Sequence, residues 1–340
     1  YADSPEYVVS NIIGVRPGWR GWSGDLTLRY RLVPADRVGV EKFSFFEKSA
    51  VLYKEFHDFR STWNLRLRPG GVREFFFLIT MKINDAPRNE PLDEEARRFW
   101  THWRRPGRTL KLGAAVVNED TDAYLRTALV LYADLQQRIG KTSYFNYGIG
   151  LDAGRYSETR YDFTTLPPER VTFDRDLAII TARTSAYIDH SNDPLNPTKG
   201  WRVNLAVQPT AVTGESNILF LRTETQGTAY FPVAGDRTIL AGRMKIGSIV
   251  GGSELNVPSD RLFYSGGGGS VRGYSYQGVN PQLPDGTPRG GLSLFETSFE
   301  VRQSIGQSFQ AVAFVDAGSV GFQETPNLTN MRYGAGVGVR

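Results

Sequence analysis

Hydrophobic and polar residues alternate along much of the chain. Between residues 144 and 153, Phe145, Ile149 and Leu151 take one set of positions, while Asn146 and Asp152 take the other. The same period of two recurs in residues 124–135, 201–208, 219–231, 238–248 and 295–302. Strict alternation over this length predicts β-strands with two unlike faces.

The length of these segments favours a transmembrane barrel over a soluble sandwich. Several exceed ten residues, whereas globular strands usually have about five or six, and a tilted strand needs roughly 9 to 11 residues to cross a bilayer. No run of about 18 apolar residues is present, which excludes a transmembrane helix. The mean hydropathy of −0.35 still permits a barrel, because lipid-facing and lumen-facing residues alternate. The predicted fold is all-β, an antiparallel transmembrane β-barrel with about 14 strands in this chain.

The connections between these segments are of two kinds. Short polar links at 138–141 and 234–237 are typical of tight turns, while residues 157–175, rich in Pro, Asp and Thr, predict a longer loop. Short turns at one rim and long loops at the other are expected of such a barrel. Helical signals are scarce, and the best candidate covers residues 93–98.

Residues 1–107 are strand-rich, but the pattern does not define their register. Plausible strands cover residues 25–31, 61–68 and 73–82. We therefore assign residues 1–107 to an N-terminal part of the barrel and residues 108–340 to its main part.

Composition removes several classes of chemistry. The chain has no cysteine, which excludes disulfides, thiolate zinc sites and a cysteine nucleophile. Its three histidines lie far apart, and no Ser-His-Asp or paired-carboxylate spacing is present, so we expect neither an enzyme nor a metal or other cofactor. A net charge of +4 is too balanced to argue for nucleic acid. Glu119, Asp120 and Asp122 could bind a divalent cation, but on a loop we expect them to be solvated.

A glycine-rich stretch between Tyr264 and Tyr274 is the most distinctive motif. It contains four consecutive glycines at 266–269 and then Val271, Arg272 and Gly273. A phosphate-binding loop would need a Lys-Ser/Thr ending and a following helix, and neither is present. The plain alternative is a flexible surface loop.

Four segments together resemble signatures of one family. The glycine-rich stretch resembles the sixth-loop signature of the outer-membrane assembly-factor (surface antigen, BamA/TamA) superfamily, and it is closest in kind to the TamA-like members. Residues 193–202 are similar to the family's turn-and-strand motif, residues 314–318 to its late-strand motif, and residues 297–300 to the strand before that. Thr297 stands where the family often has Gly.

The resemblance covers residues 108–340 and implies a sixteen-stranded barrel. Residues 333–340 then correspond to the antepenultimate strand, so about two final strands are expected to be missing, and the chain as given is not expected to close. The periplasmic POTRA domains of the family are not recognisable either.

The resemblance also implies a function and partners. Such proteins translocate and assemble β-barrel proteins or autotransporters in the bacterial outer membrane, through a lateral seam between the first and last strands. The implied partners are outer-membrane lipid, unfolded clients and, in some members, a periplasm-spanning protein. Two alternatives stay open: a two-partner-secretion-type channel or passive pore, and a soluble sandwich or propeller that binds carbohydrate.

The resemblance implies that the glycine-rich loop folds back into the lumen. There Arg272 is expected to meet the carboxylates of Glu300 and Asp316 within about 6 Å, a contact that we call the loop lock. A guanidinium suits this task because its planar fork can bridge two carboxylates. The residues of this hypothesis are Val271, Arg272, Gly273, Tyr274, Glu300, Phe314, Asp316 and Gly318.

The turn motif has a physical role even without the family. Prolines fix φ and remove donors, Asn suits a turn, and Gly200 relieves the start of the next strand. A rigid hairpin turn that sets register is favoured over a direct contact with a client. Its residues are Asp193, Pro194, Asn196, Pro197, Gly200, Trp201 and Arg202.

Alternation also assigns faces to the strands. Leu129, Ile149 and Leu205 are predicted to face lipid. Inward positions are predicted for Asn204, Arg222, Glu224 and Gln226. Interfacial aromatic girdles could include Trp103, Trp201, Tyr230 and Phe231, although packing in the core or at the rim is an equal alternative.

Overall fold

The computed structural model describes most of the chain. The described residues are 7–15, 22–32, 43–56, 59–67, 73–82, 107–121, 123–140, 142–162, 169–233, 237–306, 309–326, 328 and 330–339. They form two compact units. The N-terminal unit comprises residues 1–138, 146–157 and 174–180, and the C-terminal unit comprises residues 139–145, 158–173 and 181–340. We describe each unit by itself.

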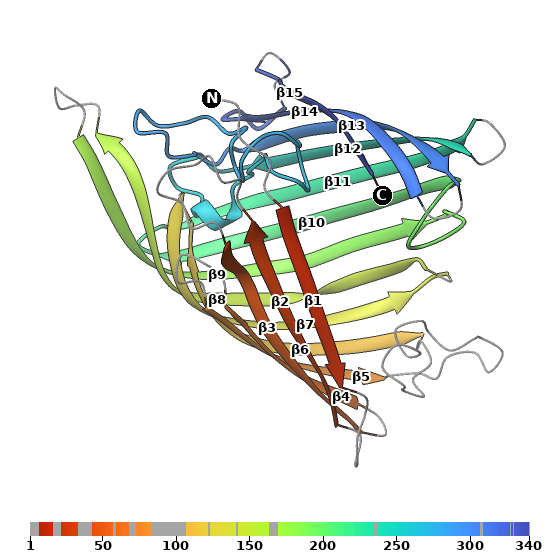
Figure 1. Cartoon of the computed structure of the whole chain (residues 1–340). Coiled ribbons are helices and arrows are strands. Elements are labelled where there is room, and N and C mark those ends of the chain that lie inside the picture. The colour runs from red at the N-terminus through yellow and green to blue at the C-terminus, as the bar shows by residue number, and fades with distance from the viewer. Residues whose placement is uncertain are drawn as a thin grey trace. The chain divides into compact units, whose positions relative to one another are not determined.

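The described residues are almost entirely β-structure (Figure 1). Fifteen strands follow one another as sheet neighbours in chain order, against about 14 expected from the sequence. In the described part of the chain, the only helical element is a single 3₁₀ turn at Ser259–Arg261. Among the described residues, no helix has the length and apolar character needed to cross a bilayer.

The N-terminal unit contains seven complete antiparallel strands. They are β1 (Tyr7–Val15), β2 (Trp22–Leu32), β3 (Phe43–Glu55), β4 (Phe59–Leu67), β5 (Arg73–Lys82), β6 (Arg108–Asp120) and β7 (Tyr124–Arg138). The three strands predicted within residues 1–107 lie in β2, β4 and β5, and the bounds of β5 agree with the prediction. Alternation alone did not single out β1 and β3.

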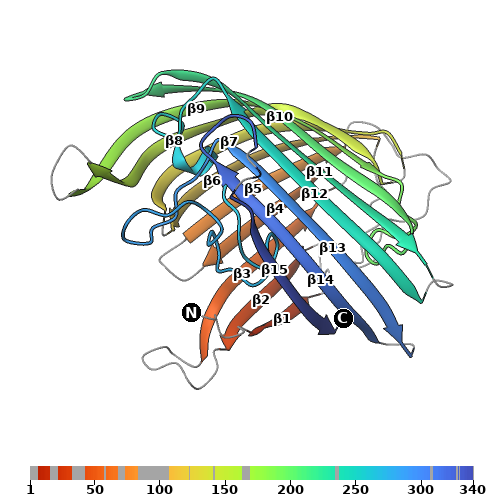
Figure 2. The ribbon, with the colours of Figure 1, turned by 90° about the horizontal axis from the view of Figure 1, so that it is seen from above.

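The C-terminal unit contains six complete strands and one long connection. The strands are β10 (Gly200–Gly214), β11 (Ile218–Pro232), β12 (Thr238–Val250), β13 (Ser293–Ile305), β14 (Phe309–Gly321) and β15 (Arg332–Val339). Each pairs antiparallel with the next. Residues 251–292 connect β12 to β13, and Figure 2 shows this connection beside the sheet.

The prediction of a loop at residues 157–175 is wrong over most of this range, which is β-strand instead. Strand β8 (Tyr144–Asp162) continues into it and β9 (Glu169–Asp189) begins within it. Polar residues pair across this hairpin: Arg155 bonds Asp176 and Ser157 bonds Asp174. A strand whose two faces are both polar lacks the alternation on which the prediction rested.

The two short links are each one residue longer than predicted: residues 139–143 lie between β7 and β8, and residues 233–237 lie between β11 and β12. Residues 93–98, Trp103, Lys141 and residues 234–236 lie outside the described part. Glu119 and Asp120 are strand residues at the end of β6 and not loop residues as expected, and Glu119 faces Arg126 at 3.9 Å. Asp122 lies outside the described residues.

Side-chain exposure agrees with the predicted faces. Leu129, Ile149 and Leu205 are 47%, 56% and 40% exposed. Arg222 and Glu224 lie on the other face, where Arg222 donates to Glu224 and to the carbonyl of Arg261 in the 251–292 connection. The three predicted lipid-facing residues are therefore exposed and Arg222 and Glu224 lie on the opposite face, although Asn204 on that face is exposed too.

Candidate functional site

Strands β13 and β14 present a polar wall on one face. Glu296, Ser298 and Glu300 alternate along β13 and share that face because side chains repeat every two residues in a strand. Their antiparallel register sets Ser298 opposite Asp316 and Glu300 opposite Phe314. Two carboxylates, a hydroxyl and an aromatic ring are thus held side by side by backbone pairing alone.

Arg272, in the 251–292 connection, binds both carboxylates of this wall. Its Nε and Nη2 donate to the two oxygens of Asp316 at 2.6 and 2.7 Å, and its Nη1 donates to Glu300 Oε1 at 2.6 Å. Nη2 also donates to Ser298 Oγ at 3.0 Å, and the backbone N–H donates to Asp316 at 3.0 Å. These distances lie within the 6 Å limit stated above.

The surroundings strengthen this ion pair. The Asp316 side chain is fully buried, so its charge requires a partner. The guanidinium also lies 3.5 Å from the centre of the Phe314 ring, which adds a cation–π contact. The hydrogen bonds to Asp316, opposed by partial burial and joined by the contact with Glu300, raise the pKa of Arg272 above its ordinary value. Arg272 is therefore a permanent cation at this position.

Glycines allow the loop to approach the wall. A Cβ at Gly334 of β15 would lie 2.0 Å from the Arg272 carbonyl oxygen, and one at Gly318 would lie 2.7 Å from Val271. Gly273 has a φ of 93°, in the left-handed region that favours glycine. Gly336 accommodates the Phe314 ring in the same way.

The remaining residues of the hypothesis lie around this contact. Val271 is fully buried, and the Tyr274 hydroxyl donates to the Tyr333 carbonyl of β15 at 3.1 Å. The loop therefore contacts three strands, β13, β14 and β15.

Sequence reasoning missed several partners in this region. Ser298 bonds Arg272, Arg302 donates twice to Glu300 at 2.8 and 2.9 Å, and Glu296 receives loop hydroxyls. The alternation of residues 295–302 places all three on the face of Glu300, but it does not show which of them bond the loop or Glu300. Arg243 of β12 also reaches the loop, and its parity with Lys245 is the corresponding signal.

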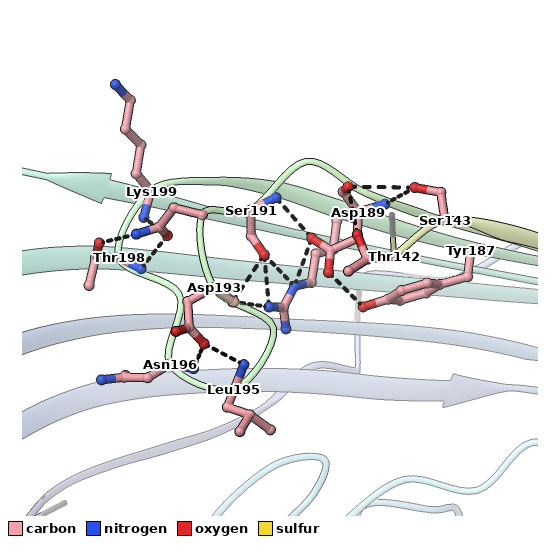
Figure 3. Close-up of polar contacts among 12 residues, drawn as sticks. Thr142, Ser143, Tyr187, Asp189, Ser191, Asp193, Leu195, Asn196, Thr198 and Lys199 are labelled. Atoms are coloured by element: carbon pink, nitrogen blue, oxygen red, sulfur yellow. Dashed lines mark hydrogen bonds and ion pairs between the residues drawn. The ribbon is translucent and has the colours of Figure 1, made fainter. Parts of the chain in front are cut away.

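The β9–β10 turn is held by its own side chains (Figure 3). Asp193 Oδ1 accepts the backbone N–H groups of Leu195 and Asn196 at 2.7 and 2.8 Å. Asn192 Oδ1 accepts those of Thr198 and Lys199, both at 3.0 Å. The bonds from Asn196 and Leu195 hold the pKa of Asp193 below its ordinary value.

Arg202, early in β10, connects this turn to the end of β9. Its Nε donates to Asp189 at 3.2 Å, its Nη2 to Ser191 Oγ at 2.8 Å and to the Asp193 carbonyl at 2.6 Å. The Asp189 backbone N–H donates to Ser143 Oγ in the β7–β8 turn at 2.9 Å. Two successive turns are thus joined at one end of this unit (Figure 3).

The other motif residues fit a rigid turn. Gly200 has a φ of 102°, and a Cβ there would lie 2.2 Å from the His190 carbonyl oxygen. Pro197 is buried, whereas Pro194 is exposed.

Of the aromatic residues considered for a girdle, two are exposed and one is packed, which is the alternative that the sequence left open. Trp201 and Phe231 are 44% and 63% exposed. Tyr230 is only 7% exposed, and the guanidinium groups of Arg202 and Arg302 lie 5.8 and 5.5 Å from its ring. In the sheet register Tyr230 is opposite Gly200, on the face of Arg202, which explains the difference.

A polar cavity of about 410 Å³ lies between the loop tip and the strands of this unit. Arginine is its main charged residue, with one carboxylate, Glu300, in the lining. Its arginines are Arg202, Arg243, Arg272 and Arg302. Within the described residues, no group of His, Asp or Glu side chains is arranged to hold a metal ion.

Comparison with known proteins identifies the family. Residues 96–340 match the Omp85 superfamily domain, and the chain therefore belongs to the Omp85 superfamily. Members of this superfamily are outer-membrane β-barrel proteins that assemble or secrete other proteins.

Two solved structures are similar to the chain. BamA from Haemophilus ducreyi lacking POTRA domains 1–3 is 13% identical, with a TM-score of 0.63 over 92% of this chain and 68% of that one. CdiB from Acinetobacter baumannii is 12% identical, with a TM-score of 0.47, and the chain spans 53% of its length. The BamA likeness agrees with an antiparallel barrel fold.

Proposed function

We propose that this chain forms the barrel domain of an outer-membrane translocation and assembly factor, which inserts or folds β-barrel proteins or autotransporters through a lateral seam. Residues 1–107 supply the N-terminal strands of that barrel and residues 108–340 the rest. The observation that carries the proposal is the loop lock, in which a connecting loop is bound through Arg272 to strands β13 and β14.

The loop lock connects the loop to the last described strand. The Arg272 carbonyl lies against Gly334, and Tyr274 bonds the backbone of Tyr333. A change in loop position therefore changes the support of β15. This physical link is what a factor that opens near its last strands requires.

Strand β15 is itself suited to exchange partners. It pairs with β14 over eight positions, whereas β13 and β14 pair over thirteen. Three of its residues are glycines, which weaken a strand through backbone entropy and the lack of side-chain packing. Weak pairing of this kind favours strand exchange, because N–H and C=O groups released from it can pair with an incoming strand.

The exposed apolar face supports outer-membrane lipid as the surrounding medium. The partners are then unfolded barrel or autotransporter clients, and the braced turns at Thr142–Ser143 and Asp189–Arg202 offer a rigid end to a periplasm-spanning protein. No covalent step is needed, since strand pairing supplies the free energy.

Depletion of the protein in its own host tests the proposal. We expect lower amounts of folded β-barrel proteins or autotransporters in the outer membrane, restored by the wild-type gene but not by an Arg272→Ala copy. A passive pore predicts loss of ion conductance with normal assembly, and a two-partner-secretion channel predicts loss of a single secreted protein. Either of those results would overturn the assembly function.

A further inference from the structure

The glycine run at 266–269 cannot hold itself in place. Glycine loses more conformational freedom on ordering than any other residue, and it has no side chain to anchor. Gly266 and Gly267 nevertheless adopt φ values of 116° and 101°. Groups outside the run must therefore supply the free energy that orders it.

One residue of the wall and one residue of the adjacent strand β12 contact this part of the loop. Arg243 of β12 donates from Nη1 to the Gly269 carbonyl at 2.9 Å and from Nη2 to the Ser270 carbonyl at 2.7 Å. Glu296 of β13 accepts the hydroxyl of Ser265 at 2.9 Å and that of Ser270. The run is thus bound at both of its ends.

The contact network is buried and internally connected. Glu296 and Ser265 are each 2% exposed. The Ser265 and Ser270 hydroxyls lie 2.9 Å apart, and the Gly266 N–H donates to Ser270 Oγ at 3.0 Å. Arg243 lies 3.6 Å from Glu296, which partly compensates the buried carboxylate.

These groups are separate from those of the loop lock. Arg272 binds Glu300, Ser298 and Asp316, whereas Arg243 and Glu296 bind Ser265, Gly269 and Ser270. Both sets nevertheless act on one loop, because Ser270 and Arg272 are two residues apart. Loss of either set leaves the other to hold the loop.

We propose that Arg243 and Glu296 form a second anchor for this loop, a glycine-run clamp, and that release of the loop from the wall requires the clamp and the loop lock to open together. They are positioning residues, which hold the glycine run so that Arg272 meets its carboxylates. The inference deepens the proposed function by adding a second contact that controls loop release.

A buried cysteine can report release directly, because the chain has no cysteine of its own. Val271 is fully buried in the docked loop, so Val271→Cys should react with a maleimide only when the loop leaves the wall. Ile239 is 1% exposed on β12, and Ile239→Cys reports opening of the sheet instead. Labelling rates are measured on the protein reconstituted in lipid vesicles.

We expect Glu296→Gln to raise the labelling rate of Val271→Cys about tenfold, as removal of hydrogen bonds to a charged group predicts, without raising that of Ile239→Cys. Glu224→Gln is the matched control, because Glu224 is a carboxylate of β11 that pairs with Arg222 and Lys245 and not with the glycine run. Arg272→Lys combined with Glu296→Gln should label faster than either alone. Arg243→Lys should restore part of the protection lost in Arg243→Gln.

Ser270→Ala removes the loop hydroxyl that bonds Glu296 and leaves the wall intact. If Glu296→Gln does not fold, the labelling rate of Val271→Cys in the Ser270→Ala background tests the clamp instead. Rates within about twofold of the parent for both variants would overturn the clamp. If labelling follows the expectation while cells assemble their barrels normally, the clamp stands and the proposed function fails. If labelling is unchanged while Arg272→Ala abolishes assembly, the clamp fails and the proposed function stands.

Discussion

Arg272 and Arg202 use the same chemistry over very different sequence separations. Arg202 binds Asp189, 13 residues away, at the end of one hairpin. Arg272 binds Asp316 and Glu300, 44 and 28 residues away, on two strands that its own loop does not belong to. A guanidinium fork satisfies buried carboxylates in both places.

The difference lies in what each contact holds. Arg202 joins the two strands of the β9–β10 hairpin, so its contacts cannot break without loosening the start of β10. Arg272 joins a loop to strands that are already paired through their backbones over thirteen positions. The second contact can therefore open while the sheet stays intact, which is the property expected of a movable part.

The largest effect is expected from Arg272→Ala. It leaves the fully buried Asp316 without its cation, at a cost of about 3 to 5 kcal/mol, less where water enters. The loop is then held by Arg243 and Glu296 alone, so it should leave the wall more often and assembly of client barrels should fall sharply. Arg272→Lys should recover part of the activity, since an ammonium cannot reproduce the planar fork.

The measurement is the amount of folded client in the outer membrane, with protease sensitivity of the loop as the second readout. Arg155→Ala is the control, because that arginine pairs with Asp176 while more than half exposed. A released loop with full assembly would show that the loop lock is dispensable.

The next effect concerns the register that the β9–β10 turn sets in β10. Leu205→Arg places a charge on the exposed apolar face and should lower the free energy of unfolding in lipid by about 2 to 4 kcal/mol near the midplane. Asn204→Arg, one residue earlier on the polar face, should cost much less. Urea unfolding in vesicles measures both, and equal costs would contradict the assigned faces.

Arg202→Ala should lower the free energy of unfolding by about 1 to 3 kcal/mol, because the Asp189 side chain, only 2% exposed, loses a charged donor. The loop should stay docked. If Val271→Cys stays slow to label in the Arg202→Ala background while the unfolding free energy falls, Arg202 stabilises the hairpin and does not hold the loop. Fast labelling would instead show that the turn and the loop are coupled.

The smallest effect is a pH dependence of the turn. The pKa of Asp193 is lowered by the N–H groups of Asn196 and Leu195, so its stabilising contribution is present above its unfolded pKa of about 3.9 and is lost as the pH falls through the lower folded value. Hydrogen exchange at Leu195 and Asn196 should therefore lose protection only in strong acid. Asp193→Asn should remove that pH dependence, and an unchanged profile in the variant would contradict the assignment.

Local pattern was sufficient for most strands and for the motif residues. Strand β5 has the predicted bounds, and Leu205 and Arg222 lie on the predicted faces, because side-chain direction alternates with every residue in a strand. The Asp193 turn is also local, since its hydrogen bonds span two or three residues.

Other features depend on partners distant in the sequence. The extension of β8 and β9 through the predicted loop depends on pairs such as Arg155–Asp176, 21 residues apart. Arg243 donates to the carbonyl oxygens of Gly269 and Ser270, 26 and 27 residues away, on a connection whose course the alternation of β12 cannot show.

By itself, the sequence determined most of the strands, their faces and the family to which the loop motif belongs, because each depends on a period of two or on a short contiguous segment. Only the tertiary structure decided that Arg243 and Glu296 hold the glycine run. Four glycines carry no periodic signal, and the position of such a segment is determined by the donors and acceptors that the folded wall presents to it.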